Sequence, residues 1–265
     1  MSIVQKGVRS LKQDGVLETS KTFYRLCIRS IFKNYTFFDE YTKARHYIHR
    51  ALYDAPADPY KVLWIDPERP DCASKAGERW LGLGQIIERN HSKWEFDDIE
   101  TYKSVKQRFE QNKEWKDTDI YKKAKRMFEN GSTFEGYKNI EQFEKERCEY
   151  VDRLFESIQR EGYKRINSRD FDMPDSDVRA NKMKSLHRLE PLVVIDADGS
   201  IYYRDGFHRI AIAEVLGINS IPVNVLARHR GWQNIRDDIY KTEHQSELNS
   251  EMRKYLDHPD LKDVA

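Results

Sequence analysis

Apolar residues recur at three- and four-residue spacing through much of the first 160 residues of the chain. This is the period of an amphipathic helix, whose apolar stripe packs on the protein while its polar face meets water. The spacing predicts helices over residues 94–109, 117–129 and 140–160, and Asp117 or Thr118 is the expected N-cap of the second. The aromatic residues at helical spacing are expected to fill a core. A short strand or extended segment is predicted at residues 61–66.

The pattern changes between Glu190 and Leu226, where short β-branched runs alternate with turn signals. Residues 191–196 and 201–203 favour two strands, and the Asp-Gly turn between them favours a hairpin. Residues 207–216 return to helical spacing and are followed by a glycine, which is typical of a helix end. Residues 221–226 are a further predicted strand. This segment therefore predicts a compact strand-turn-strand-helix-strand unit.

Together these elements predict an α+β fold, with a helical N-terminal region followed by a small mixed αβ domain. Turn-rich residues after Tyr53 and a helix end at Gly162 supply two of the divisions. The predicted divisions are residues 1–53, two basic amphipathic helices; residues 54–162, mostly helical; residues 163–236, the small αβ domain; and residues 237–265, a charged C-terminal helix with a frayed end.

The charge balance gives no support for a protein that coats nucleic acid over its whole surface. Lys and Arg number 46 against 45 for Asp and Glu, a net charge of +1. Three cysteines, Cys27, Cys72 and Cys148, are far apart and form no C-x-x-C pair, which favours reduced thiols and a cytoplasmic location. No stretch approaches the roughly 20 apolar residues that span a bilayer, and the N-terminus lacks the apolar core of a signal peptide. No transmembrane segment is therefore predicted.

The loop from Asp205 to Arg209 carries the clearest chemistry. Gly206 would let the backbone approach a ligand, and the residues after it begin a helix, whose free N–H groups and dipole favour an anion. His208 and Arg209 add donors at the same point, and the planar guanidinium matches phosphate oxygens. Asp205 could orient His208, accept a proton or bind Mg²⁺ beside the phosphate. The structural alternative is that Asp205 caps the helix, Arg209 pairs with a carboxylate and His208 is a packed polar residue.

The order strand, Asp-Gly turn, strand, D-G-x-H-R loop, helix, Leu-Gly and Ile-Pro-Val strand resembles the ParB/sulfiredoxin superfamily. The corresponding loop is G-E-R-R in ParB, G-C-H-R in sulfiredoxin and D-G-H-H-R in ADP-dependent free-serine kinases. The loop of this chain is most similar to the kinase form, with Phe207 in place of the first His. It holds no cysteine, so sulfiredoxin chemistry is disfavoured. The segment after the last strand, A-R-H-R-G-W-Q, also resembles a tail in uncharacterised members of the superfamily.

The resemblance implies a nucleotide-binding domain, and most directly a phosphotransferase that acts on a small hydroxyl-bearing substrate. ADP or ATP, or alternatively CTP, would bind with Mg²⁺. Gly206, His208 and Arg209 would hold the phosphates, with Asp205 and His208 as the catalytic residues. Arg228 follows the last strand of the unit and is a further candidate for the phosphate, with a solvated basic cluster as the alternative. The second interpretation is a CTP-switched module that binds DNA or a partner, as in ParB, although no helix-turn-helix follows the unit. The third is a ParB-like nuclease, for which the sequence shows no metal-carboxylate cluster.

Several further residues are candidates without a firm role. The first 50 residues carry ten Lys or Arg and four Asp or Glu, a net charge of +6, which predicts either peripheral contact with a membrane or polyanion, or basic helix faces in water. His46 and His49 could give two metal ligands but lack a third, so no metal site is predicted. The remaining candidates lie upstream of the unit: a carboxylate acting as base, from Asp170, Asp172, Asp175, Asp177 or Glu190, and the phosphate partners Arg169, Arg179 and Lys182.

Overall fold

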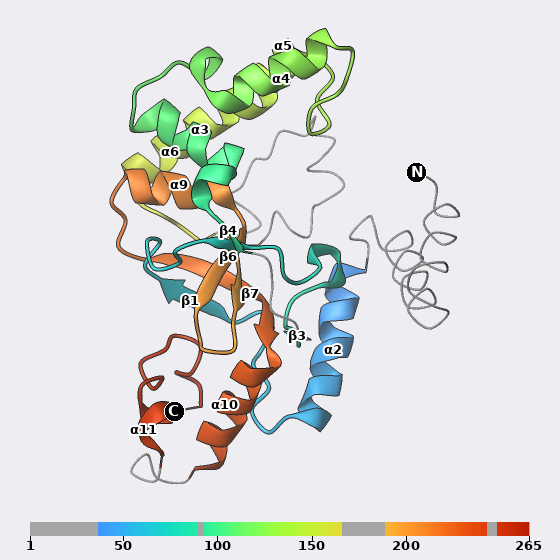
Figure 1. Cartoon of the computed structure of the whole chain (residues 1–265), viewed down its shortest axis with the longest axis vertical. Coiled ribbons are helices and arrows are strands. Elements are labelled where there is room, and N and C mark those ends of the chain that lie inside the picture. The colour runs from blue at the N-terminus through green and yellow to red at the C-terminus, as the bar shows by residue number, and fades with distance from the viewer. Residues whose placement is uncertain (1–36, 89–92, 166–188, 243–247, 265) are drawn as a thin grey trace, which may run out of the picture.

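A computed structural model of the chain describes residues 37–88, 93–165, 189–242 and 248–264. Over these residues, one mixed sheet of seven strands lies at the centre, with groups of helices at two opposite ends (Figure 1). No helix among them has both the length and the apolar character needed to cross a bilayer. The two helices predicted within residues 1–36 lie outside the described residues.

The sheet is assembled on β7 (Ile221–His229). The first half of β7 pairs antiparallel with β1, its last three residues pair parallel with β3, and β5 runs parallel along its other side. Because β7 has neighbours on both sides, only its last residue is not fully buried. The order of the sheet is β1-β7-β5-β6-β2-β4, with β3 beside β7. The other strands are β1 (Val62–Ile65), β2 (Ala73–Ser74), β3 (Gln85–Ile87), β4 (Lys93–Trp94), β5 (Leu192–Ile195) and β6 (Ile201–Asp205).

Strands β5 and β6 form the predicted antiparallel hairpin. At its closed end Ile195 pairs with Ile201, and the Gly199 N–H donates to the Asp196 carbonyl at 3.1 Å. At its open end Leu192 pairs with Asp205, the last residue of β6, and helix α9 (Phe207–Val215) begins two residues later. The closed end of the hairpin (residues 196–200) and its open end (residues 191 and 205–206) therefore lie one hairpin length apart.

The helices are arranged around the two ends of the hairpin (Figure 1). On the side of the open end, α9 packs against α3 and α6, with α4 and α5 farther out. On the side of the closed end, α10 packs against β7, and α11 lies near the C-terminus. Helix α2 lies beside the sheet. The bounds are α2 (Phe38–Leu52), α3 (Glu100–Phe109), α4 (Asp119–Glu129), α5 (Ile140–Phe143), a π-helical turn (Glu144–Cys148), α6 (Glu149–Glu161), α10 (Arg230–Lys241) and α11 (Ser250–Arg253).

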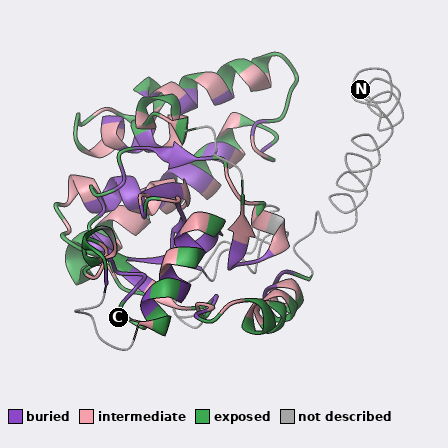
Figure 2. Cartoon of the chain, turned by 60° about the horizontal axis from the view of Figure 1, so that its bottom comes forward, coloured by how far each residue is buried: buried purple, intermediate pink, exposed green. Residues whose placement is uncertain are grey.

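The main core lies between the sheet and the helices of the open-end side. Buried residues cover the sheet and the inner faces of these helices, while α4, α5 and α2 are largely exposed on their outer sides (Figure 2). Val193, Tyr203 and Ile210 are fully buried in one apolar cluster with residues of α3 and α6. The aromatic residues at helical spacing thus fill a core, as the sequence predicts: Phe109 and Phe155 stack with ring centroids 3.9 Å apart.

The α+β class is confirmed, and the predicted strands and helices of residues 191–226 are present. The predicted division at residue 163 is not a division of the sheet, because β1, β2 and β3 pair with strands that follow residue 190, and β4 pairs with β2. Residues 54–162 therefore contribute strands as well as helices. The helix expected from residue 94 begins only at Glu100, after β4 and a 3₁₀ turn. The segment at residues 61–66 is β1, as expected.

The prediction of a frayed C-terminal end is wrong. Helix α10 begins within the predicted αβ domain and runs to Lys241, across the division at residue 237. Farther on, Asp260 and Leu261 are fully buried. The end of the chain is held because Asp260 supplies the carboxylate that two buried arginines need.

Candidate functional site

The open end of the hairpin places the Asp205–Arg209 loop at the start of α9. Gly206 has φ +90° and ψ 20°, the left-handed conformation that an L side chain rarely adopts. A Cβ atom here would lie 2.8 Å from the Cα of Pro191, which belongs to the neighbouring chain segment. Packing within the protein therefore already requires glycine at this position, whether or not a ligand approaches its backbone. Every residue from Arg204 to Arg209 stays partly accessible to solvent.

The Asp205 carboxylate interacts with two groups at this point, a backbone N–H and a guanidinium. The Gly206 N–H donates to its carboxylate at 2.9 Å, and the Arg79 guanidinium forms an ion pair with it. Burial alone would raise the pKa of the Asp205 carboxyl, but the charge and hydrogen bond of Arg79 hold that pKa below its ordinary value. About a third of each of the two side chains, 32% for Arg79 and 33% for Asp205, is exposed. The carboxylate is thus ionised, paired and accessible.

Arg79 is the site residue that the sequence did not predict. It lies in a 3₁₀ turn (Arg79–Leu81) between β2 and β3, and 126 residues separate it from Asp205. The buried Gln85 side chain fixes this turn: its amide donates to the Glu78 carbonyl at 2.9 Å and to the Gly82 carbonyl at 2.8 Å. The turn therefore presents the Arg79 guanidinium in a fixed position.

Arg209 pairs with a carboxylate, as in the structural alternative to a phosphate site. Its guanidinium donates to the buried Glu190 carboxylate at 3.2 Å and to the Leu189 carbonyl at 2.8 Å. The pKa of the Tyr163 hydroxyl is raised to about 12, mainly by burial. Arg209 lowers this pKa and Glu190 raises it, so Tyr163 lies beside this pair. Arg209 therefore anchors the start of α9 to the segment before β5, and Glu190 is already engaged by a cation.

The remaining polar groups of the loop surround the first turn of α9. His208 lies in this turn and is half-buried. The first N–H groups of a helix have no intrahelical acceptor, so those of α9 add partial positive charge here. Arg204, the residue before Asp205, donates from its Nε to the Ala76 carbonyl at 3.0 Å. Arg79, Arg204 and Arg209 thus face two carboxylates, those of Asp205 and Glu190, which leaves these five groups with one excess positive charge.

The prediction that Arg228 binds the phosphate does not agree with its position. Its partner across the sheet is Ile195, whereas Asp205 is the partner of Leu192, so the two residues lie at opposite ends of β5. Arg228 is only 2% exposed, and it donates from Nε and from a terminal nitrogen to Asp260, at 2.9 and 2.6 Å. Its guanidinium is committed to a structural ion pair.

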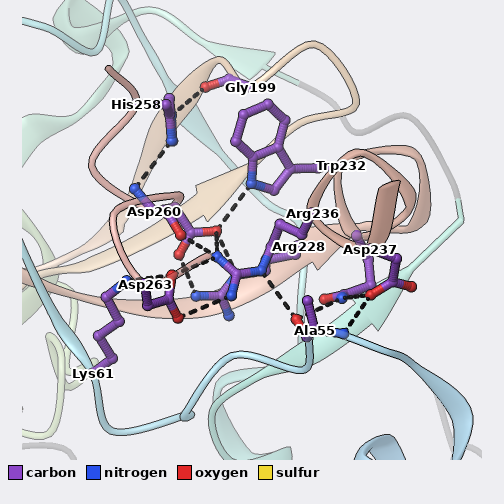
Figure 3. Close-up of polar contacts among 11 residues, drawn as sticks. Ala55, Lys61, Gly199, Arg228, Trp232, Arg236, Asp237, His258, Asp260 and Asp263 are labelled. Atoms are coloured by element: carbon purple, nitrogen blue, oxygen red, sulfur yellow. Dashed lines mark hydrogen bonds and ion pairs between the residues drawn. The ribbon is translucent and has the colours of Figure 1, made fainter. Parts of the chain in front are cut away.

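Arg228 belongs to a buried cluster at the closed end, drawn in Figure 3. The Trp232 indole donates to the Asp260 carboxylate at 3.0 Å, and Arg236 donates to the Asp260 carbonyl and to Asp263. Burial alone would raise the pKa of Asp260, but the guanidiniums of Arg228 and Arg236 hold that pKa well below its usual range. Arg228, Trp232 and Arg236 are spaced four residues apart and all contact Asp260, which gives the A-R-H-R-G-W-Q segment a structural purpose.

His258 completes the cluster in its neutral form. Its Nδ1 accepts the Asp260 N–H at 3.1 Å, and its Nε2 lies 2.9 Å from the Gly199 carbonyl, which can only accept, so Nε2 carries the proton. Burial lowers the pKa of His258 to about 4. The histidine therefore joins the C-terminal segment to the turn of the hairpin.

The remaining predicted candidates are the upstream residues and the two histidines of α2. Residues 166–188, with the upstream Asp, Arg and Lys candidates, lie outside the described residues. Within the described ranges, no group of three or more His, Cys, Asp or Glu side chains could hold a metal ion. His49 instead packs edge-on against Tyr53, and burial together with Arg45 lowers its pKa to about 4.

The chain matches no model of a known protein family, and no similarity to a curated protein or to a solved structure was found. The resemblance to the ParB/sulfiredoxin superfamily therefore remains a prediction from the loop and its flanking elements. The arrangement on its own is an accessible ion pair, Arg79 with Asp205, at the N-terminus of a helix, flanked by two further arginines.

Proposed function

We propose that the protein binds the phosphates of a nucleotide at the start of α9 and transfers a phosphoryl group to a small hydroxyl-bearing substrate. The observation that carries this proposal is the Arg79–Asp205 ion pair, brought together across 126 residues at a helix N-terminus. A partly exposed ion pair is worth little in stability, so its guanidinium can exchange a carboxylate for a phosphate at small cost. In this proposal Arg79, and not Arg228, binds the phosphate.

The chemistry asks mainly for positioning and neutralisation of charge. Arg79, His208 and the first N–H groups of α9 would bind the phosphate oxygens, and Arg209 would keep α9 in place through Glu190. In the transfer step, the bond between phosphorus and the nucleotide oxygen breaks and a new bond forms to the acceptor oxygen. When Arg79 moves to the phosphate, the pKa of Asp205 rises because its main counter-charge has left. Asp205 is then suited to accept the proton of the acceptor hydroxyl.

Mg²⁺ fits this site only as a companion of the nucleotide. The open end offers the Asp205 carboxylate as an oxygen ligand, and the described residues contain no cluster that would hold the ion alone. Nucleotide-bound Mg²⁺ keeps several waters and commonly takes only one or two carboxylates from a protein. In this chain it would neutralise phosphate charge next to Arg79.

The test begins with the melting temperature of the full chain in ADP, ATP, CTP and GTP, each with Mg²⁺. A ligand that binds only the folded state raises the melting temperature, and at 100 times its Kd it adds roughly 2.7 kcal/mol. We expect stabilisation by ADP or ATP that is lost in Arg79→Ala and His208→Ala. Arg230→Ala is the matched control, because Arg230 forms an exposed ion pair with Glu88 at the start of α10.

Transfer itself is measured by phosphorus NMR with a panel of hydroxyl compounds. A new phosphate ester formed by the wild-type chain and not by Asp205→Asn supports the proposal. Stabilisation by CTP alone, without product, would favour the nucleotide-switched module instead. No stabilisation by any of the four nucleotides contradicts the proposal.

A further inference from the structure

Helix α2 exposes an unusual number of large apolar side chains. Among the seven large apolar residues that the described chain exposes, four lie on α2 or directly before it: Phe37, Tyr47, Ile48 and Leu52. Tyr47 is 78% exposed and Leu52 is 67% exposed. With the exposed Ala44 and Ala51, they recur at three- and four-residue spacing, so they form one face of the helix, which we call the outer face of α2.

The opposite side of α2 is firmly attached to the protein. Phe38 and Thr42 are buried, and the Thr42 hydroxyl accepts the Leu83 N–H at 3.0 Å. Arg45 donates to the carbonyls of Leu81 and Leu83, at 2.8 and 3.2 Å. These bonds hold the helix from its inner side, and Tyr47, Ile48 and Leu52 on the outer face are exposed. The same bonds join α2 to the turn that carries Arg79.

Charges along α2 are segregated. Its two acids, Asp39 and Glu40, lie in the first turn, and Asp39 accepts a hydrogen bond from Tyr60. From Tyr41 to Leu52 the helix holds only basic ionisable side chains besides its tyrosines. Lys43 and Arg50 are exposed and lie four residues before and three residues after Tyr47, at one border of the outer face. The exposed Glu40 lies at the N-terminal start of the outer face, three residues after Phe37 and four before Ala44, whereas the part of the face from Tyr47 to Leu52 is bordered by cations.

The size of the outer face limits what can cover it. Fifteen residues make a helix about 22 Å long, and a face about 10 Å wide offers roughly 200 Å². A stable interface with a second copy of the chain would need about 800 Å² on each partner. A lipid surface has no such minimum, because a helix that lies in the headgroup region gains apolar burial and attraction of its cations to anionic lipid together. A nucleic-acid backbone is charged, so it would not bury the apolar side chains of Ile48 and Leu52.

We propose that the outer face of α2 lies on the surface of an anionic membrane, with Ile48 and Leu52 between the headgroups and Lys43 and Arg50 at the lipid phosphates. The sequence before α2 adds to the attraction, since residues 1–36 carry seven Lys or Arg and two Asp or Glu. This binding site is independent of the nucleotide site, although Arg45 links the two segments.

The full chain is tested by co-sedimentation with vesicles of phosphatidylcholine alone and of phosphatidylcholine with 30% phosphatidylglycerol, at two salt concentrations. We expect binding only to the anionic vesicles, weaker at high salt. The double variant Ile48→Ser/Leu52→Ser should reduce the bound fraction at least fivefold. Trp64→Ser removes an equally exposed apolar side chain from β1 and is expected to leave binding unchanged. Equal binding of wild type and double variant overturns the proposal, as does failure of the wild type to bind.

A polarity-sensitive dye on Leu52→Cys, in a chain with Cys27→Ser, separates the other occupants of the face. A blue shift on addition of anionic vesicles is the expected result. A dye that is already blue-shifted without vesicles, at all protein concentrations, would mean that the chain covers its own face. A blue shift that grows with protein concentration, together with a dimer in light scattering, would mean that a second copy does. Either of these two results overturns the membrane assignment.

Discussion

The two ends of the β5–β6 hairpin contain the same kinds of residues but differ in how far these residues are buried. Each end has a glycine at positive φ against a bulky neighbour: Gly199 against Trp232 at the closed end and Gly206 against Pro191 at the open end. Each end also pairs arginine with aspartate, Arg228 with Asp260 and Arg79 with Asp205. At the closed end the pair is buried, with Asp260 at 0% exposure, whereas at the open end a third of each side chain meets water.

The difference in burial separates a structural ion pair from one that can bind a ligand. A buried charge without its partner is costly, so Arg228 and Arg236 must keep Asp260 for the protein to remain folded. An exposed pair contributes little to stability, so Arg79 can leave Asp205 for another anion. Arginine and acid residues in a sequence therefore indicate a ligand site only where the fold leaves them accessible.

Asp260→Ala is the change with the largest expected effect. It leaves two buried guanidiniums without their carboxylate, and we expect the free energy of unfolding to fall by about 3–5 kcal/mol. Urea denaturation of the full chain measures it. Asp263→Ala is the control, since Asp263 is partly exposed and is only one of the partners of Arg236, and it should cost about 1 kcal/mol or less. A loss below 1 kcal/mol in Asp260→Ala would show that the closed end is not held by this carboxylate.

Gly199→Ala and Gly206→Ala test whether both ends of the hairpin require glycine. A Cβ would lie 2.6 Å from the buried Trp232 ring at residue 199 and 2.8 Å from the Pro191 backbone at residue 206. Positive φ and the steric conflict together should cost about 2–4 kcal/mol in each variant. Gly217→Ala separates the two causes, because Gly217 has φ +64° and open space at its Cβ position. It should cost only about 1 kcal/mol, and an equal loss in all three variants would remove the steric argument.

The closed end should also depend on pH through His258. Its pKa is about 6.5 in the unfolded chain and about 4 in the folded protein, so between these values the unfolded state binds more protons. Stability should therefore fall as the pH decreases from about 6.5 to 4, by about 3 kcal/mol from this residue. Urea denaturation across this range measures the slope. His258→Gln should flatten this slope, and an unchanged slope in His258→Gln would contradict the assignment.

Arg79→Ala should have the smallest effect on stability. Its ion pair with Asp205 is partly exposed, so the free energy of unfolding should change by about 1 kcal/mol or less. The same urea experiment that is used for Asp260→Ala provides the comparison. A loss of 3 kcal/mol or more would place Arg79 among the structural arginines and remove the distinction between the two ends.

The sequence predicts those parts of the fold whose contacts are local. The hairpin, α9 and the first part of β7 follow one another within 40 residues, and turn residues and apolar spacing define each of them. Strands β2 and β4 have two residues each and exist only because they pair with β6 and with each other. No pattern in so short a segment can indicate a strand, so residues 54–162 were expected to be mostly helical.

The candidate site was predictable to the same extent. Asp205, Gly206 and His208 stand together in the sequence, and the predicted helix begins at Phe207, directly after Gly206. The partners of the arginines were not predictable, because Arg79 and Asp260 come from distant parts of the chain. For this reason the sequence predicts Arg228 as a phosphate-binding residue, whereas the proposal based on the structure assigns that role to Arg79. Glu190 was a candidate base, and the fold makes it the partner of Arg209.

Isothermal titration of the full chain with ADP and ATP in Mg²⁺ measures phosphate binding at the open end most directly. The wild type should bind one of the two, and Arg79→Ala should weaken its affinity at least tenfold, as expected for loss of a charge-assisted hydrogen bond worth about 1.5–3 kcal/mol. Arg230→Ala should stay within twofold. Equal affinities of wild type and Arg79→Ala, in variants that remain folded, would show that nucleotide phosphates do not bind at the start of α9.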